Sequence, residues 1–332
     1  MVFADGDATV GAGHVMRCLA LAEAFCRKGY QVNWAARSLA VALRDRVTRL
    51  PTVVYDIDEA VDLTETLEQC GSDVLIVDTY KLTASEVSAL PVNSTICVAV
   101  DDNELLDSPA FDVIVNPNID ASPNRYRKRR ADAKLLCGSA YTMIRQEFLD
   151  VAGRTRSMLP PRRVLVTMGG GDALDTGIAA AETVASALPD AEIQLLLGPA
   201  ASQDVPAFRA ANVSAVGATD RMAEVLSETD LVISAAGSTT WEICCLGLPA
   251  ILVVTANNQA GLAKRLAEEG LALTVDAREA DWPASLQRSL EECLLDPQKE
   301  LDRAYLRHDL IDGLGADRIV DEIVGVQLEA NA

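Results

Sequence analysis

Gly11, Gly13 and His14 stand between a short apolar run and a run with helical spacing. A strand, a glycine turn and a helix N-terminus together favour an anion, because free N–H groups and the positive end of the helix dipole face it. A dinucleotide fingerprint would need a third glycine where Met16 stands. We therefore predict a phosphate site here, with Arg17 among its ligands, and no NAD.

His14 falls in the first turn of this helix, where the helix dipole disfavours an imidazolium. A neutral histidine beside a phosphate site is a candidate general base. The alternative is that His14 only caps or packs the first turn. The other histidine, His308, lies in a charged helical segment and is expected at the surface.

Polar residues follow three consecutive strands predicted at 74–77, 96–100 and 113–115. Ligands of open α/β sheets bind outside the carboxyl ends of strands, so we expect these side chains to line one crevice with His14: Asp78, Tyr80, Asp101 and Asn116. Tyr80 and Asp101 are predicted to act with His14 in catalysis. For any one aspartate, capping of the next helix is the alternative. Arg145 is the expected cation of the same crevice.

The strand, glycine turn and helix recur after the strand predicted at 164–168. This pattern indicates a second anion site, facing the first across a cleft. Its expected ligands are Gly169, Gly170 and Asp172.

A further turn at Gly237 and Ser238 precedes a helix that carries Glu242. A carboxylate there can accept both hydroxyls of a ribose, although a helix dipole also favours an acid at this position without any ligand. Asn258 and Gln259 offer amides to phosphate or to base edges. We predict a nucleotide site built from these residues.

The chain has 332 residues, of which 49% are hydrophobic and 23% are charged. Short apolar runs alternate with helical patterns, which is typical of βαβ units on a parallel sheet. The length favours two domains of about 150 residues. We expect an N-terminal Rossmann-like domain at 1–150, a nucleotide-binding domain at 162–300, and C-terminal helices at 301–332 that pack back on the first domain.

The net charge of −20 argues against nucleic acid and anionic membranes as partners. Eight cysteines are scattered without zinc spacing, so we predict reduced thiols, no metal and no cofactor. No membrane span or signal peptide is evident, and a cytoplasmic protein is expected. The basic run 125–130 is expected to be a solvated loop, with docking of an acidic partner as the alternative.

Several motifs occur together in the order seen in one family. They are G-x-G-H-V-M-R, V-D-x-Y, D-D, N-P, Y-x-x-I-R-x-E-F, M-G-G-x-D, and G-x-x-x-x-E with N-Q. In these motifs the chain resembles the PseG/SpsG family of UDP-sugar hydrolases and spore-coat polysaccharide proteins, over residues 1 to about 275. More distantly it is similar to the peptidoglycan GlcNAc transferase. Phe3 stands where relatives often carry arginine, which favours the spore-coat branch.

The resemblance implies a GT-B fold, with two Rossmann-like domains and a cleft between them. It implies a metal-independent, inverting hydrolysis of UDP-2,4-diacetamido-2,4,6-trideoxy-β-L-altropyranose in pseudaminic acid biosynthesis. His14 matches the catalytic histidine, Tyr80 a nearby hydroxyl, and Glu242, Asn258 and Gln259 the nucleotide contacts.

Two other functions remain open. One is a GT-B glycosyltransferase that uses a UDP-sugar or other nucleotide-sugar donor in surface polysaccharide synthesis. The other is a non-catalytic module that binds a sugar nucleotide, which the presence of both His14 and Tyr80 disfavours.

Overall fold

The computed structural model describes residues 1–7, 11–57, 70–90, 95–103, 106–129, 131–153, 160–169, 173–198 and 208–330. The chain divides into two compact units. Unit 1 comprises Met1–Gln146 and Gly313–Ala332, and unit 2 comprises Glu147–Asp312.

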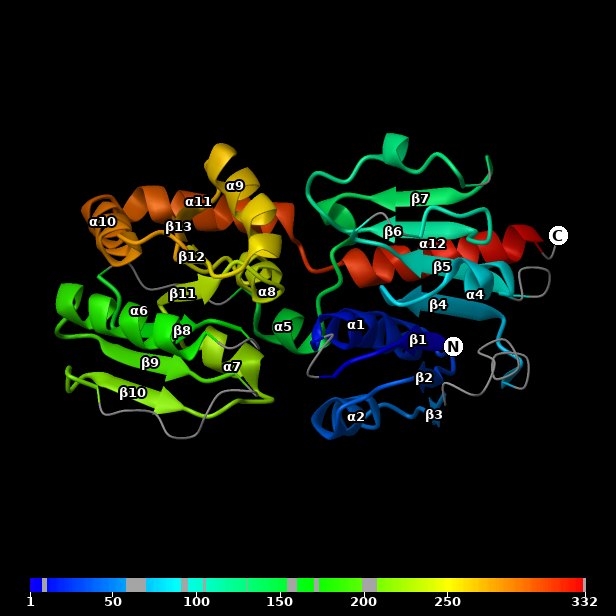
Figure 1. Cartoon of the computed structure of the whole chain (residues 1–332), viewed down its shortest axis with the longest axis horizontal. Helices are drawn as coiled ribbons and strands as arrows, with labels where there is room; N and C mark the ends of the chain where they lie inside the picture. The colour runs from blue at the N-terminus through cyan, green and yellow to red at the C-terminus, as the bar shows by residue number, and fades with distance from the viewer. Residues whose placement is uncertain are drawn as a thin grey trace. The chain divides into compact units, whose positions relative to one another are not determined.

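The described part of unit 1 is built on a seven-stranded parallel sheet in the order β3-β2-β1-β4-β5-β6-β7 (Figure 1). Its strands are β1 (Val2–Ala4), β2 (Trp34–Ala36), β3 (Val54–Asp56), β4 (Val74–Asp78), β5 (Ile96–Val100), β6 (Val113–Asn116) and β7 (Lys134–Cys137). Its helices are α1 (Gly13–Arg27), α2 (Val41–Val47), α4 (Ala84–Ser88) and α12 (Gly315–Ala330), with short 3₁₀ turns η1 (Pro123–Arg125) and η2 (Ser139–Tyr141).

Both faces of this sheet are covered, as the alternation of side chains along β1 requires. Val2 and Ala4 belong to a core shared with α1 and α12, whereas Phe3 packs on the opposite face in a core that includes Val87 of α4. Successive side chains of a strand point to opposite faces, so a short continuous apolar run serves two cores at once. The unit is therefore a doubly wound α/β domain.

The strand order of unit 1 reverses between β1 and β4, because β2 and β3 lie on one side and the later strands on the other. A crevice for ligands forms outside the carboxyl ends of the strands at such a reversal. Ala4 of β1 pairs in register with Asp78 of β4. The loop that follows Ala4 leads to α1, so the sheet delivers α1 and Asp78 to the same place.

Unit 2 contains a six-stranded parallel sheet within its described residues, in the order β10-β9-β8-β11-β12-β13. The strands are β8 (Arg163–Thr167), β9 (Glu192–Leu196), β10 (Val213–Val216), β11 (Leu231–Ala235), β12 (Ala250–Val254) and β13 (Leu273–Asp276). The helices are α5 (Gln146–Val151), which begins at the last residue of unit 1, α6 (Leu174–Ala187), α7 (Met222–Ser227), α8 (Thr239–Cys245), α9 (Ala260–Glu268), α10 (Trp282–Leu295) and α11 (Pro297–Leu310), with the 3₁₀ turn η3 (Asn257–Gln259). The order reverses between β8 and β11, as it does between β1 and β4.

Of the helices expected to return to the first domain, α12 belongs to unit 1 and α11 belongs to unit 2. Ile319, Val320 and Ile323 place α12 in the core of α1. In α11, Arg307 is 1% exposed and donates to the carbonyl oxygens of Leu248 and Leu271, which fixes this helix to unit 2.

Two details of unit 2 differ from the sequence-based expectations. β13 was not predicted, although it pairs in register with β12. His308, expected at the surface, is half-buried, and its Nδ1 lies 2.6 Å from the carbonyl oxygen of Cys245.

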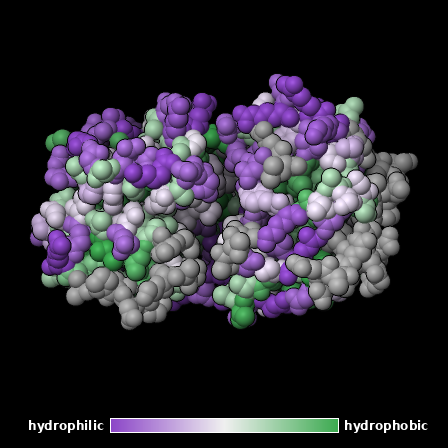
Figure 2. All heavy atoms as spheres, viewed as in Figure 1, coloured by the Kyte–Doolittle hydropathy of each residue, from purple (hydrophilic) through white to green (hydrophobic). Residues whose placement is uncertain are grey.

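The visible face in Figure 2 is mainly hydrophilic, in keeping with the strongly negative net charge. No helix among the described residues is long and apolar enough to cross a membrane. All eight cysteines are free thiols, as predicted.

Candidate functional site

α1 begins with backbone groups that no side chain caps. Gly11 has a φ of +83°, a conformation that side-chain-bearing residues rarely adopt, and Ala12 at the N-cap position has no side-chain hydrogen bond to offer. Helix formation at Gly13 then places His14 in the first turn. The glycine turn therefore sets where the imidazole enters the crevice at the β1–β4 reversal.

His14 is buried against Asp78, the last residue of β4. Its Nδ1 lies 2.5 Å from Asp78 Oδ1 and 3.3 Å from Arg17 Nη2. Nδ1 cannot donate to the carboxylate and accept from the guanidinium at once, and the shorter, charge-assisted contact decides that Nδ1 carries the hydrogen. In the described part of the chain Nε2 has no hydrogen-bond partner, so its lone pair is the proton acceptor that remains.

Arg17 holds Asp78 in its ionised form. Its Nε and Nη2 donate to the two oxygens of Asp78, each at 2.6 Å, and Cys18 Sγ donates to Oδ2 at 3.3 Å. Burial alone would raise the pKa of Asp78, but the charge and hydrogen bonds of Arg17 and the bond from His14 outweigh it, so this pKa is lowered. Burial and Asp78 raise the pKa of Cys18, so the thiol stays protonated.

Tyr80 and Asp102 complete this group of side chains. Arg17 Nη1 donates to Asp102 Oδ2 at 2.5 Å, and the Tyr80 hydroxyl donates to Asp102 Oδ1 at 2.8 Å. The Tyr80 ring meets the His14 ring edge to face, with centroids 4.3 Å apart. We call these five residues, His14, Arg17, Asp78, Tyr80 and Asp102, the His14 cluster.

Asp102 was quoted in the sequence only as part of a D-D pair, and its neighbour Asp101 was the predicted catalytic residue. The carboxylate of Asp101 instead accepts from the backbone N–H of Leu106 at 2.9 Å. Asn116 donates through Nδ2 to the hydroxyl of Tyr126 at 2.9 Å. The structure thus places Asp101 and Asn116 beneath the cluster, and Asp102 in it.

Arg145 is buried in the turn that precedes α5, with 7% of its surface exposed. The basic run is anchored by Tyr126, which is fully buried, while the backbone N–H groups of Arg127, Lys128 and Arg129 all donate to the carboxylate of Asp107. The expected solvated loop is therefore ordered from within by one aromatic ring and one carboxylate.

In unit 2, the residues predicted to bind nucleotide follow β8, β11 and β12, which are neighbours in the sheet. Gly169 has a φ of +76° directly after β8, and Gly170 and Asp172 lie outside the described residues. Gly237 and Ser238 form the turn after β11, and half-buried Glu242 lies in the first turn of α8.

After β12, the side chain of Gln259 is already used within its own loop. Its Oε1 accepts from the backbone N–H and the hydroxyl of Thr255, at 2.8 and 3.1 Å. Asn258, beside it, is exposed. Gln259 therefore shapes the loop, and Asn258 is the amide that this loop presents to solvent.

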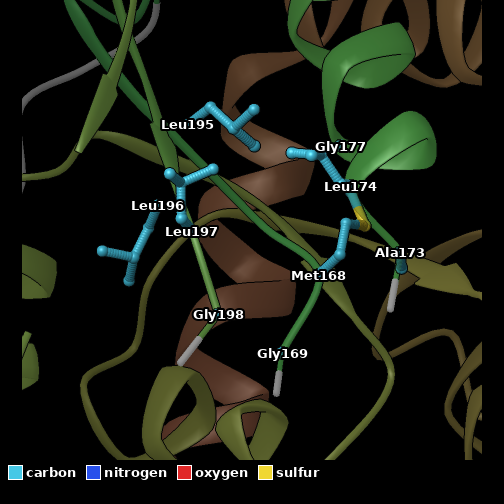
Figure 3. Close-up of a pocket in the computed structure, with 9 residues that line it drawn as sticks. All are labelled: Met168, Gly169, Ala173, Leu174, Gly177, Leu195, Leu196, Leu197 and Gly198. Carbon is cyan, nitrogen blue, oxygen red and sulfur yellow. The ribbon is translucent and has the colours of Figure 1, made fainter. Parts of the chain in front are cut away.

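A small apolar cavity lies at the carboxyl ends of β8 and β9 beside the start of α6 (Figure 3). Its volume is about 20 Å³, and Met168, Gly169, Gly177 and Leu195 contribute to its lining. This space suffices for about one water molecule and not for a nucleotide. Within the described residues, no group of three or more His, Cys, Asp or Glu side chains could hold a metal ion.

Residues 164–308, nearly all of unit 2, match the glycosyltransferase family 28 C-terminal domain. The chain is 20% identical over 326 residues to the spore coat polysaccharide biosynthesis protein SpsG of Bacillus subtilis, covering 96% of this chain and 95% of that protein. It is 21% identical over 267 residues to an uncharacterized protein of Methanocaldococcus jannaschii, covering 76% of this chain and 54% of the relative. The match thus spans about half the length of that relative.

Two solved structures are similar over almost the whole chain. MurG of Acinetobacter baumannii has a TM-score of 0.63 and 19% identity, covering 98% of this chain and 99% of that one. The UDP-GlcNAc 2-epimerase of Neisseria meningitidis, solved with UDP-GlcNAc, has a TM-score of 0.68 and 12% identity, with the same coverage of 98% and 99%. The fold is therefore GT-B, with two Rossmann-like domains, and the comparisons support an enzyme of the GT-B glycosyltransferase-like class.

Proposed function

We propose that the protein transfers a sugar from a nucleotide-sugar donor, with His14 as the base that activates the acceptor. The observation that carries this proposal is the contact of 2.5 Å between His14 Nδ1 and a buried Asp78 whose ionised form Arg17 stabilises. A histidine oriented in this way through Nδ1 is prepared to take a proton at Nε2.

In the proposed reaction, an acceptor oxygen attacks the anomeric carbon of the sugar while its proton passes to Nε2 of His14. The bond between that carbon and the diphosphate oxygen breaks, and the nucleoside diphosphate leaves with the bonding electrons. The imidazolium that forms faces the carboxylate of Asp78, which stabilises the new charge. The attack and departure on opposite sides would invert the anomeric centre.

The charge of the His14 cluster argues that the diphosphate is held by unit 2. Two carboxylates, Asp78 and Asp102, share one guanidinium, and three nitrogen atoms of Arg17 already donate to them. A diphosphate beside this group would meet net negative charge. We therefore assign Arg17 to holding the cluster and not to binding phosphate, in contrast to its expected role.

Unit 2 offers the features that a nucleotide needs. Gly169 brings backbone close to the helix start after β8, where N–H groups and the helix dipole favour phosphate. Glu242 in α8 is proposed to accept ribose hydroxyls, and Asn258 to meet the base or a phosphate. The UDP-GlcNAc named for the epimerase supports uridine as the first nucleotide to test.

A specific observation keeps hydrolysis as the second candidate. Only 5% of the His14 side chain is exposed, which favours a small acceptor such as water. Under this proposal the substrate is UDP-2,4-diacetamido-2,4,6-trideoxy-β-L-altropyranose, as the resemblance implies. The name of SpsG supports a setting in surface polysaccharide synthesis for either reaction.

The test incubates the protein with a panel of UDP-sugars, with and without sugar or lipid-linked acceptors, and measures released UDP and the sugar product. Transfer predicts UDP release that depends on an acceptor, and hydrolysis predicts free sugar from the donor alone. A panel in which no donor yields UDP above the rate of the His14→Asn variant would contradict both.

A further inference from the structure

The five side chains of the His14 cluster form a closed circuit of contacts. His14 touches Asp78, Asp78 binds Arg17, and Arg17 binds Asp102. Asp102 then accepts from the hydroxyl of Tyr80, whose ring returns to His14. Asp102 is the link that uses one oxygen for each neighbour, so its removal opens the circuit at two points.

Asp102 is held in place from behind, by residues that do not belong to the cluster. Asn118 Nδ2 donates to the backbone oxygen of Asp102 at 2.6 Å. The backbone oxygen of the preceding residue, Asp101, accepts from the buried hydroxyl of Tyr126 at 2.8 Å, and its carboxylate binds Leu106. The turn that presents Asp102 is thus fixed independently of Arg17 and Tyr80. Asp102 can therefore impose a position on both.

Tyr80 depends on Asp102 for its own position. The tyrosine is 45% exposed, and the bond to Asp102 is the one hydrogen bond of its hydroxyl within the described residues. Burial and the charge of Asp102 raise the pKa of Tyr80, so the hydroxyl stays protonated and continues to donate. Tyr80 is consequently fixed as a donor to Asp102 and is not available as a second base.

We propose that Asp102 is a positioning residue that keeps the Tyr80 ring against His14 and Arg17 on Asp78, and so fixes the orientation of the proposed base. Its effect on turnover rests on the proposed function. Its effect on the geometry of His14 rests on the contacts alone and can be measured without substrate.

The measurement without substrate uses NMR of protein with ¹⁵N- and ¹³C-labelled histidine. The chain has two histidines, so His14→Asn assigns both sets of signals. Asp102→Ala and Tyr80→Phe should each move the His14 ring signals, because each breaks the bond that holds the Tyr80 ring in place. The double variant should move them no further than Asp102→Ala alone. Asp120→Ala, which alters an exposed carboxylate 3.7 Å from Arg125, is the matched control and should leave them unchanged.

In turnover, Asp102→Ala should lower kcat by roughly 10–100-fold with little change in KM, the effect expected when a reacting group is displaced. Adding Tyr80→Phe should then lower kcat little more. Effects of the two substitutions on kcat that multiply, or His14 signals that stay at their parental positions in Asp102→Ala, would overturn the positioning role. Absence of any donor turnover, with the NMR coupling present, would overturn the proposed function alone.

Asp102→Asn provides a second test that a loss of folding in Asp102→Ala cannot obscure. It keeps an oxygen for Tyr80 but removes the negative charge that Arg17 shares. Among the groups that face His14, Asp78, Arg17 and Tyr80, the first then remains as the one anion. The acidic limb of the turnover profile should move to lower pH, because less negative charge stabilises the imidazolium. A limb that stays in place would contradict a role for the charge of Asp102.

Discussion

His14 and Asp78 are 64 residues apart in the sequence, yet their side chains meet in a buried contact of 2.5 Å. The pair is useful for chemistry because Arg17 stabilises the ionised carboxylate without competing effectively for Nδ1. Each of the three residues has a defined task in this arrangement: Nε2 takes a proton, Asp78 sets the tautomer, and Arg17 balances charge.

Replacing Asp78 by asparagine should reveal this arrangement in stability. The substitution removes the buried anion that Arg17 grips, and the unfolding free energy should fall by about 3 kcal/mol, the lower end for a broken buried pair because Arg17 keeps Asp102. Urea unfolding of the parent and of Asp78→Asn measures the loss. Asp120→Asn, at an exposed carboxylate, should change it by no more than about 0.5 kcal/mol.

The same pair predicts a pH dependence. The folded pKa of Asp78 lies below its ordinary value of 3.8, so its contribution to stability is present above that pH and is lost as the pH falls through the lowered folded pKa. The stability difference between the parent and Asp78→Asn should therefore be constant from neutral pH down to about 3.8 and shrink below it. A difference that vanishes well above that value would mean that Asp78 is not held ionised.

The sequence was sufficient to predict His14, Arg17, Asp78 and Tyr80 as neighbours, because each follows a parallel strand or begins the helix after one. It was not sufficient to choose between Asp101 and Asp102. Adjacent residues of a turn point in different directions, and here the choice is made by hydrogen bonds from Leu106, Tyr126 and Asn118, which lie beyond any local pattern.

At the scale of elements, α12 shows how one close approach fixes a helix. A Cβ added at Gly315 would overlap the backbone of Thr142, next to the turn η2, whereas Gly325 in the same helix has open space around it. Backbone atoms cannot yield as a flexible side chain can. The start of α12 is therefore the point at which the end of the chain is locked to unit 1.

Two alanine substitutions in α12 should act in opposite directions. Gly315→Ala should lower the unfolding free energy by about 1–3 kcal/mol through overpacking. Gly325→Ala should raise it by about 0.5–1 kcal/mol, because alanine loses less conformational freedom than glycine in a helix. Thermal unfolding monitored by circular dichroism compares them. Equal effects of the two would show that α12 is not docked through Gly315.

Arg307 should have the same importance for α11. Its guanidinium is buried with Glu300 and with the carbonyl oxygens of Leu248 and Leu271. Arg307→Met leaves a carboxylate without its cation in the core, and should cost about 3–5 kcal/mol. Arg288→Met is the control, since that side chain is 64% exposed and 3.9 Å from Asp281, and chemical denaturation should find it near the parent. A small loss for Arg307→Met would mean that packing alone holds α11.

Most strands and helices could be predicted from hydrophobic runs and their spacing, including the alternation that gives two parallel sheets. The pattern failed for β13, a four-residue edge strand that is only partly buried. It also could not separate α11 from α12, because both have the spacing of amphipathic helices. The unit to which each belongs is decided by long-range contacts, buried Arg307 in one case and Gly315 in the other.

At the scale of the whole molecule, the two units repeat one strand order and divide the proposed work. The reversal point of unit 1 carries the His14 cluster, and that of unit 2 carries the turns proposed to bind nucleotide. A net charge of −20 does not attract an anionic donor, so nucleotide binding must come from these local features.

Glu242→Gln tests the nucleotide side of this division. Glutamine keeps the shape of the side chain but weakens its bonds to ribose hydroxyls, so about 1–3 kcal/mol of UDP binding should be lost. Isothermal titration calorimetry gives the Kd of both proteins. Glu268→Gln, an exposed acid of α9, is the control. An unchanged Kd in Glu242→Gln would remove Glu242 from the proposed site.

The most direct test of the central claim compares turnover and UDP affinity in the parent and in His14→Asn, using the donor that gives the highest turnover. If His14 is the base, kcat should fall by roughly 10²–10⁴-fold while the Kd for UDP stays within a factor of about two. His308→Asn, at the other histidine, should retain parental kcat. Near-parental turnover in His14→Asn would contradict the account, because no base would then be needed at Nε2.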